Sequence, residues 1–222
     1  MGISERRERE KLERRKTILA CAKELILSQG VEHINMEEIA RKAELSKATV
    51  YLYFSSKEIL LNEICEDAAR NFLYHVKPFL DTGLTGMAAL KCFWGGFLEL
   101  FGNSDEMIII FKVRNYLNSS LPVFLLKEQS KSQHVDEILV AMGKLIDQCK
   151  AEGFFDPNLD SVTATRLLLS VFSITVEKAA CIPLEARKSP AFIEEMTNTF
   201  QIIIRGFAGD GVDRSYLNIA GV

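Results

Sequence analysis

The chain has 222 residues, of which 48% are hydrophobic and 26% are charged, and its formal net charge is −3. These values are ordinary for a soluble globular protein with a real core in one large or two small domains. A membrane span is not expected, because the longest uncharged apolar stretch, Leu167 to Val176, has 10 residues and a span needs about 18. The first apolar patch, Ile18 to Leu27, is interrupted by Lys23 and Glu24, so it is no secretory signal and we expect a cytoplasmic protein.

The charge is divided unevenly along the chain. Residues 1–57 hold 12 Lys and Arg against 9 Asp and Glu, a net charge of +3, and the remainder carries −6. A basic N-terminal segment on an acidic body is typical of a protein with a local DNA-binding head. Such asymmetry also arises by chance, so a motif is needed to support it.

The five cysteines form no CxxC pair, and the three histidines are scattered. The sequence therefore predicts no metal site and no cofactor. Every cysteine lies in an apolar-periodic segment, which favours a small buried side chain over the alternative of a redox-sensing thiol. The cysteines are Cys21, Cys65, Cys92, Cys149 and Cys181.

Residues 1–16 are charged with mixed sign, and we expect a frayed arm leading into the first helix. The helix itself is marked by apolar residues on one face, namely Ile18, Ala22, Leu25 and Ile26. It should end at Gly30, which can supply a left-handed C-cap.

Two short helices follow, joined by a turn of about three residues. Asn35 with Glu38 three residues later predicts a capping box, and the second helix should begin there with its apolar residues inward. Ser46 is the next N-cap, and the third helix should run from Lys47 to Phe54. This arrangement, spanning about residues 35–54, predicts a helix-turn-helix.

The third helix has an unusual charge pattern. Between Leu45 and Lys57 there are two lysines and no acid, and each lysine falls in the first turn of a helix. A cation there opposes the helix dipole unless an anion such as a phosphate lies in front of it. Leu45, Val50 and Phe54 can pack inward while polar side chains face outward, so the pattern indicates DNA binding.

Two alternatives remain for this segment. Val50 to Phe54 is rich in β-branched and aromatic residues and fits a strand, although a lone strand would have no partner in this chain. A helix-turn-helix that packs against another element without touching DNA is the second alternative.

The rest of the chain is predicted to be helical. A fourth helix should start near Ser56 and stop at Pro78, and longer helices are expected at about 85–102, 105–119, 133–152, 158–181 and 190–207. The fold class is therefore all-α, with a three-helix DNA-binding domain at 1–57 and a helical ligand-binding and dimerisation domain at 58–222. Their boundary lies at the start of a long helix, so no flexible hinge is expected.

These motifs resemble the DNA-binding domain of the tetracycline-repressor (TetR) family of transcription regulators over about residues 12–72. The resemblance is carried by A-x-x-L-x-x-x-G, by I-A-R-K-A and by S-K-A-T-V-Y-x-Y-F-x-x-K-E. The body is similar only in outline, through helix lengths, G-F-x-D-P-x-L-D and the closing I-I-I-R-G-F. The resemblance implies an all-helical homodimer with a four-helix interface and a ligand cavity among the central helices.

The resemblance also implies roles for individual residues. Lys47, Ala48 and Tyr51 would read base edges, beside the helix cap Ser46. Phosphate contacts would come from side chains of Thr49, Tyr53 and Lys57 and from backbone amides of Asn35 and Met36. Two positions depart from the family pattern: Ala48 replaces a frequent glycine, giving a methyl group that suits a thymine methyl. Glu44 also stands where a glycine is usual, so the turn must change its geometry or strain a non-glycine residue.

The body offers candidates for a ligand site and for a dimer interface. Aromatic residues interleaved with polar ones suggest a largely apolar cavity with a few polar anchors, although a packed core is the plainer interpretation. The predicted ligand residues are Trp94, Phe97, Phe111, Asn115, Asn118 and Phe172. The last two long helices hold more apolar residues than one body can cover, which predicts a dimer interface of Leu167, Leu168, Val171, Ile174, Phe192, Met196, Phe200 and Ile203.

The sequence thus predicts a ligand-responsive transcription regulator, most simply a repressor released from a palindromic operator by a small, largely apolar or aromatic molecule. Its partners would be double-stranded operator DNA, a small-molecule effector and a second copy of the chain, with no membrane. A helical enzyme is the first alternative, but no phosphate loop, metal spacing or catalytic triad supports it. An adaptor that no longer binds DNA is the second, with Glu44 as its one supporting feature.

Overall fold

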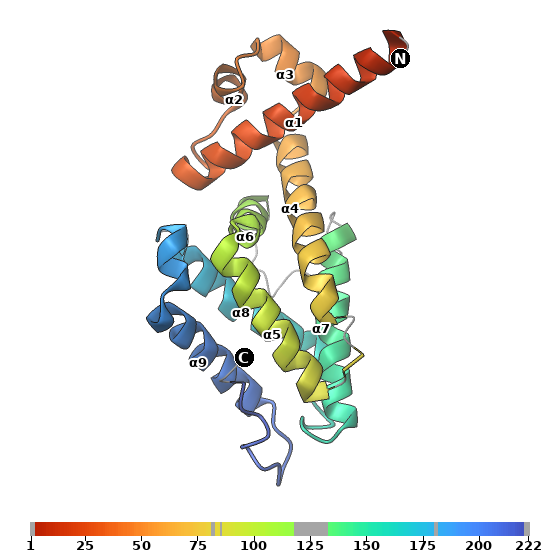
Figure 1. Ribbon diagram of the computed structural model, residues 1–222, viewed down its shortest axis with the longest axis vertical. Helices are drawn as coiled ribbons and strands as arrows, with labels where there is room; N and C mark the ends of the chain where they lie inside the picture. The colour runs from red at the N-terminus through yellow and green to blue at the C-terminus, as the bar shows by residue number, and fades with distance from the viewer. Residues whose placement is uncertain (1–2, 81–82, 85, 118–132, 180–181, 220–222) are drawn as a thin grey trace.

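The computed structural model describes residues 3–80, 83–84, 86–117, 133–179 and 182–219. Within this part, α-helices alternate with short turns, and the shape is elongated (Figure 1). A head at one end is joined to a larger body by a long helix that runs into the body. The helices are α1 (Ile3–Gln29), α2 (Met36–Lys42), α3 (Lys47–Tyr53), α4 (Lys57–Leu80), α5 (Gly86–Asn103), α6 (Glu106–Leu117), α7 (Gln133–Ala151), α8 (Ser161–Ala179), the 3₁₀ turn η2 (Leu184–Lys188) and α9 (Pro190–Gly206).

The head contains α1, α2 and α3, and its helix ends confirm the predicted caps. Gly30 adopts φ +88° after α1. Asn35 Oδ1 accepts hydrogen bonds from the amides of Glu37 and Glu38 at 3.1 and 2.9 Å, which satisfies two amides that α2 leaves unpaired. Ser46 caps α3 through the amide of Thr49 at 3.0 Å. The strand interpretation of Val50 to Phe54 is wrong, because this segment is α3 and its C-cap.

Two predicted helix boundaries are wrong. Residues 3–16 belong to α1 rather than to a frayed arm. Alternating charges support these exposed turns, as in the Arg6–Glu10 pair four residues apart at 2.9 Å. In turn, α4 continues past Pro78 to Leu80. A proline so close to a C-terminus removes one hydrogen bond without having to bend a long continuation of the helix.

Half-buried ion pairs connect the head to the body. Lys23 of α1 lies 2.6 Å from the Asp67 carboxylate of α4 and 3.7 Å from the Glu106 carboxylate of α6. Arg15 of α1 pairs with Glu63 of α4, and its guanidinium lies 4.5 Å from the centre of the Phe54 ring. The head is therefore held by α4 and by α6 together, which Figure 1 shows side by side below it.

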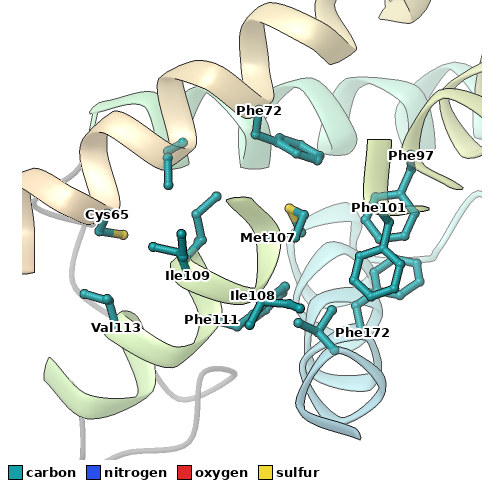
Figure 2. Packing of buried hydrophobic residues seen from close by; sticks show 14 of the residues in the cluster. Cys65, Phe72, Phe97, Phe101, Met107, Ile108, Ile109, Phe111, Val113 and Phe172 are labelled. Atoms are coloured by element: carbon teal, nitrogen blue, oxygen red, sulfur yellow. The ribbon is translucent and has the colours of Figure 1, made fainter. Parts of the chain in front are cut away.

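The body has two kinds of core. On one side, the aliphatic residue Ile109 of α6 lies beneath α4 on the side of Cys65 (Figure 2). On the other side, α5, α8 and α9 contribute a cluster of stacked aromatic rings. Met107 lies between the two groups in Figure 2.

The segment after α9 folds back onto the body. Phe155 and Ala208 form an isolated antiparallel bridge. The buried Gln201 side chain donates to Leu217 O at 2.7 Å and accepts from the Ile219 amide at 2.8 Å. This returning segment covers the lower part of α9, so that end of the helix is already packed within the protomer.

None of the helices in the described residues is both long enough and apolar enough to cross a lipid bilayer.

Candidate nucleic-acid interface

The N-termini of α2 and α3 meet at an open hollow on the outer surface of the head. Its volume is about 600 Å³. The hollow is lined by Asn35, Met36, Glu37, Glu38, Arg41, Lys47 and Tyr51. The first turns of α2 and of α3 both border this hollow, and the positive end of a helix dipole favours an anion nearby.

Most residues predicted to read DNA lie on this surface. Lys47, Ala48 and Tyr51 are exposed on α3, while Val50 and Phe54 are fully buried beneath it. Burial of the inner face fixes the rotation of α3 about its axis, so the side chains on the other face must point outward. The outward orientation predicted from sequence is therefore confirmed.

The polar residues at the start of α3 already have partners in the chain. Ser46 Oγ and Thr49 Oγ1 share a hydrogen bond of 2.8 Å. Asn35 uses its side-chain oxygen to cap α2, which leaves its backbone amide and that of Met36 at the leading end of the helix. Their roles toward phosphate stay proposals. Tyr53 is half-buried, and its carbonyl oxygen accepts from Arg15 at 3.3 Å.

Sequence reasoning missed two residues at this surface. Leu52 of α3 is almost fully solvent-exposed, which is unusual for a leucine and places an apolar group beside Tyr51. Glu37 of α2 lies across the hollow from α3, and its Oε2 is 3.2 Å from Lys47 Nζ. The position of Glu37 in the first turn of α2 could have indicated it. The capping box explained the acids of that turn, so Glu37 was not considered as a surface residue.

Lys57 does not project from this surface. Its ammonium donates to Val31 O, after α1, at 2.7 Å and lies 4.5 Å from the centre of the Tyr116 ring of α6. The predicted phosphate contact therefore requires the side chain to leave two partners. In the conformation seen, Lys57 connects the head, the start of α4 and the end of α6.

The turn between α2 and α3 shows how the chain accommodates Glu44. The sequence left open whether the turn changes its geometry or strains a non-glycine residue. The strain is observed, because Glu44 adopts φ +56°, in the left-handed region that favours glycine. The turn keeps the geometry that a glycine would give, and the strain is of the order of 1–2 kcal/mol.

The aromatic residues predicted to line a ligand cavity pack against one another. The Trp94 ring is stacked at 4.2 Å on Phe200, at 5.3 Å on Phe97 and at 5.6 Å on Phe172. All four are buried, as is Phe111 of α6, and Figure 2 shows Phe97, Phe101 and Phe172 grouped together. An effector that binds among these rings would have to open the stack.

Two features of this region bear on recognition of a ligand. Among the described residues, Trp94 Nε1 has no hydrogen-bond acceptor although the side chain is fully buried. Asn115 is half-exposed on the last turns of α6. Asn118, the other predicted polar anchor, lies outside the described residues.

The buried thiols have the properties of packing residues. Burial raises the pKa of Cys65 to about 11 and that of Cys149 to about 12, so both stay protonated near neutral pH. Cys21 is half-buried, and burial raises its pKa, with Glu24 adding to the effect. These positions favour the interpretation of the thiols as small apolar side chains; Cys181 lies outside the described residues.

The predicted dimer residues divide into two groups. Leu167 and Ile174 of α8 are exposed, and Val171 and Ile203 are half-buried. Leu168, Met196 and Phe200 are fully buried in the protomer itself, so their assignment to an interface is wrong: the helix faces were read from spacing, and these three point into the aromatic core. Phe192 also points inward and stacks on Phe101 at 5.9 Å.

Taken together, a capped pair of short helices, an outward-facing polar α3 and a buried support beneath it define a helix-turn-helix DNA-binding protein. Residues 18–64 match the sequence profile of "Bacterial regulatory proteins, tetR family". The matched segment contains the helix-turn-helix, so the head of this chain is similar to the regulators of that family.

Individual relatives match this chain over stretches of different length. The repressor KstR2 of Mycolicibacterium smegmatis is 22% identical over 148 residues, which cover 66% of this chain and 70% of the relative. The regulator YvdT of Bacillus subtilis is 37% identical over 60 residues, covering 27% of this chain and only 31% of its own length. A TetR-family regulator from Shewanella sp. PV-4 has the same fold, with a TM-score of 0.64 at 20% identity, covering 88% of this chain and 98% of that one.

Proposed function

We propose that this protein is a ligand-responsive repressor that binds a palindromic operator as a homodimer and is released by a small, largely apolar or aromatic effector. Residues 1–57 would bind DNA, and residues 58–222 would bind the effector and form the dimer. One observation carries the proposal: ion pairs join the helix-turn-helix head to α4 and α6, and Phe72 of α4 packs edge-on against Phe97 of the buried aromatic cluster. Repression is further supported by the likeness to KstR2, which is itself a repressor.

The dimer is proposed to form through α8 and α9. Exposed apolar side chains recur on both helices and have no cover within the described protomer: Val162, Leu167, Ile174, Ile193 and Ile202. Large apolar side chains left exposed on two long helices are candidates for burial in a protein interface. Two copies would place two copies of α3 on one side of the assembly, as successive major grooves about 34 Å apart require.

Coupling between effector and DNA is proposed to run through two helices. As a helix of 24 residues, α4 spans about 36 Å and moves as a rod. A second connection comes from α6, where Lys112 Nζ lies 3.5 Å from Ile26 O and Tyr116 holds Lys57. An effector that opens the aromatic cluster would displace α6 and so shift the head.

The test begins with DNA binding. Duplexes from the region upstream of the protein's own coding sequence are titrated at several salt concentrations in a mobility-shift assay, and saturable binding with a steep salt dependence is expected. Absence of binding to every upstream duplex would favour the adaptor alternative. A turnover screen addresses the remaining alternative, a helical enzyme.

Effector binding can be read directly, because Trp94 is the only tryptophan in the chain. A panel of aromatic and polycyclic compounds is screened for a change in Trp94 fluorescence, and the compounds that change it are added to the protein–operator complex. The proposal requires at least one compound to do both: change the emission and release the DNA. Compounds that quench Trp94 but never affect DNA binding would contradict the coupling.

A further inference from the structure

We propose that Glu37 is a specificity-determining residue, whose carboxylate accepts a hydrogen bond from the exocyclic amino group of a cytosine in the operator. The proposal rests on the α2–α3 surface being the one that reads DNA. It assigns a base-reading role to an acid on α2, whereas the sequence indicated only residues of α3 for that role.

The first observation is the position of the carboxylate. Glu37 lies at the rim of the α2–α3 hollow with 76% of its side chain exposed, facing Lys47 across the hollow at 3.2 Å. Its backbone amide is held by the Asn35 cap, so the start of the side chain is fixed relative to α3. An acid held at this place must lie within reach of DNA whenever Lys47 does.

The second step is electrostatic. In the free protein, Glu37 balances the charge of Lys47 in a helix that has no acid of its own. When Lys47 moves to an acceptor on DNA, Glu37 loses that partner and faces a phosphate backbone that repels it. A carboxylate in the major groove can regain a hydrogen bond only from a donor on a base edge, and those donors are cytosine N4 and adenine N6.

Between these two donors, the side chain favours cytosine. A carboxylate is an acceptor only, and cytosine offers a donor without the neighbouring N7 acceptor that adenine presents. Where another base stands, the carboxylate stays unpaired beside DNA, and that penalty creates the discrimination.

The chain provides a matched control in the adjacent residue. Glu38 has the same charge in the same first turn of α2, but only 17% of its side chain is exposed and its carboxylate faces Arg41 at 3.8 Å. Both acids interact equally well with the helix dipole, so removing either charge has a similar effect on α2 itself. Both acids line the hollow, but the Glu38 side chain is mostly covered, so Glu37 is the better placed of the two to reach a base.

The experiment is selection from a random duplex library with the full-length protein and with the variants Glu37→Gln, Glu37→Ala and Glu38→Gln. For the unchanged protein we expect one position in each half-site where cytosine is preferred by about tenfold. Glu37→Gln should change that preference to adenine, because an amide can pair with both N6 and N7. Glu37→Ala should leave the position without preference, and Glu38→Gln should give the original motif.

Salt dependence separates base reading from a general charge effect. Because Glu37 binds no phosphate, Glu37→Gln should leave the slope of log affinity against log salt unchanged on the selected site. Thermal unfolding of each variant shows whether the head still folds, and the nearly isosteric Gln variant carries the test if the Ala variant does not.

The outcomes distinguish this inference from the proposed function. A selected motif that is identical with Glu37 and with Gln overturns the inference and leaves DNA reading intact. A motif altered equally by Glu38→Gln also overturns it, since the effect would then be one of charge alone. If the unchanged protein enriches no sequence, the α2–α3 surface is not a DNA-reading surface and the proposed function fails with it.

Discussion

The head and the body of this protein use the same helical secondary structure in opposite ways. In the head, buried apolar side chains such as Val50 and Phe54 form the support, and the polar groups Lys47 and Tyr51 lie outside. In the body, the chemically distinctive groups lie inside, as the stacked rings around Trp94 do. An exposed side chain of the head can contact DNA as it stands. A buried ring of the body can contact an effector only if the packing around it opens.

Charged side chains supply several contacts between the two regions, beside the apolar core that the head shares with α4. Lys23, Lys112 and Lys57 each bridge the head to α4 or α6, and each is at least partly buried. Polar contacts between two well-packed regions are easier to rearrange than apolar ones, because water can replace a lost partner. This division predicts that the two regions can shift against each other without unfolding, which the following experiments examine.

The largest effect is expected from the unpartnered face of the body. In the double variant Ile174→Glu and Ile202→Glu, charges replace side chains that are 59% and 72% exposed in the protomer. If this face is the dimer interface, each buried charge costs several kcal/mol, and the dimer should weaken by at least about a hundredfold. Sedimentation of the DNA-free protein measures it.

Val140 of α7 provides the control, being 57% exposed on a helix outside the proposed interface. Val140→Glu should sediment as the unchanged protein does. An intact dimer in the double variant would show that α8 and α9 do not form the interface. The exposed apolar side chains of the body would then have no binding role comparable to that of the exposed residues of the head.

The next effect concerns the interior of the body. Trp94→Ala removes the central ring of the stack and should lower the free energy of unfolding by about 3–5 kcal/mol in urea titrations. Trp94→Phe should cost far less, because in the described residues the indole N–H has no acceptor to lose. Equal losses in the two variants would mean that the N–H is paired in solution, for instance by water.

The sequence predicted the head more completely than the body. In the head, Asn35, Ser46 and Gly30 mark helix ends through local chemistry, and each behaves as predicted. Local signals of this kind depend on the backbone within a few residues, so no tertiary contact is needed to interpret them. The same logic missed Glu37, whose partner lies on another helix.

In the body, spacing along a helix identified apolar faces but not what covers each one. Leu168 and Ile174 both fit an apolar stripe of α8, yet one is buried in the protomer and the other is exposed. Only the packing of other helices around α8, chiefly α7 and α6, separates them. Lys57 is a similar case, since its partners Val31 and Tyr116 are distant in sequence and no local pattern joins them.

A smaller effect is expected at the junction between the regions. We expect Lys57 to exchange Tyr116 for a phosphate when DNA binds, so Lys57→Ala should lower the magnitude of the log–log salt slope by about one. Tyr116→Leu removes the competing ring and should strengthen binding to any duplex by about threefold, since a partly buried cation–π contact contributes about 0.5–2 kcal/mol.

Tyr116→Phe keeps the aromatic face and should bind DNA as the unchanged protein does. In the Lys57→Ala background, Tyr116→Leu should no longer alter affinity, which a double-mutant cycle measures. If Lys57→Ala leaves the slope unchanged, Lys57 stays within the protein on DNA, and its role is to hold the head to α6.

The smallest effect tests whether the head is as rigid as its caps suggest. Glu44 is held at φ +56°, where a glycine carries no strain, so Glu44→Gly should raise the free energy of unfolding by up to about 1 kcal/mol. The gain is limited because glycine also increases the entropy of the unfolded chain. Glu44→Gln keeps a side chain at the strained position and removes only the charge, so it should not share the gain. A stabilisation seen equally in both variants would assign the effect to charge, because Glu44 lies near the Glu24–Lys42 pair, which is closed at 2.8 Å.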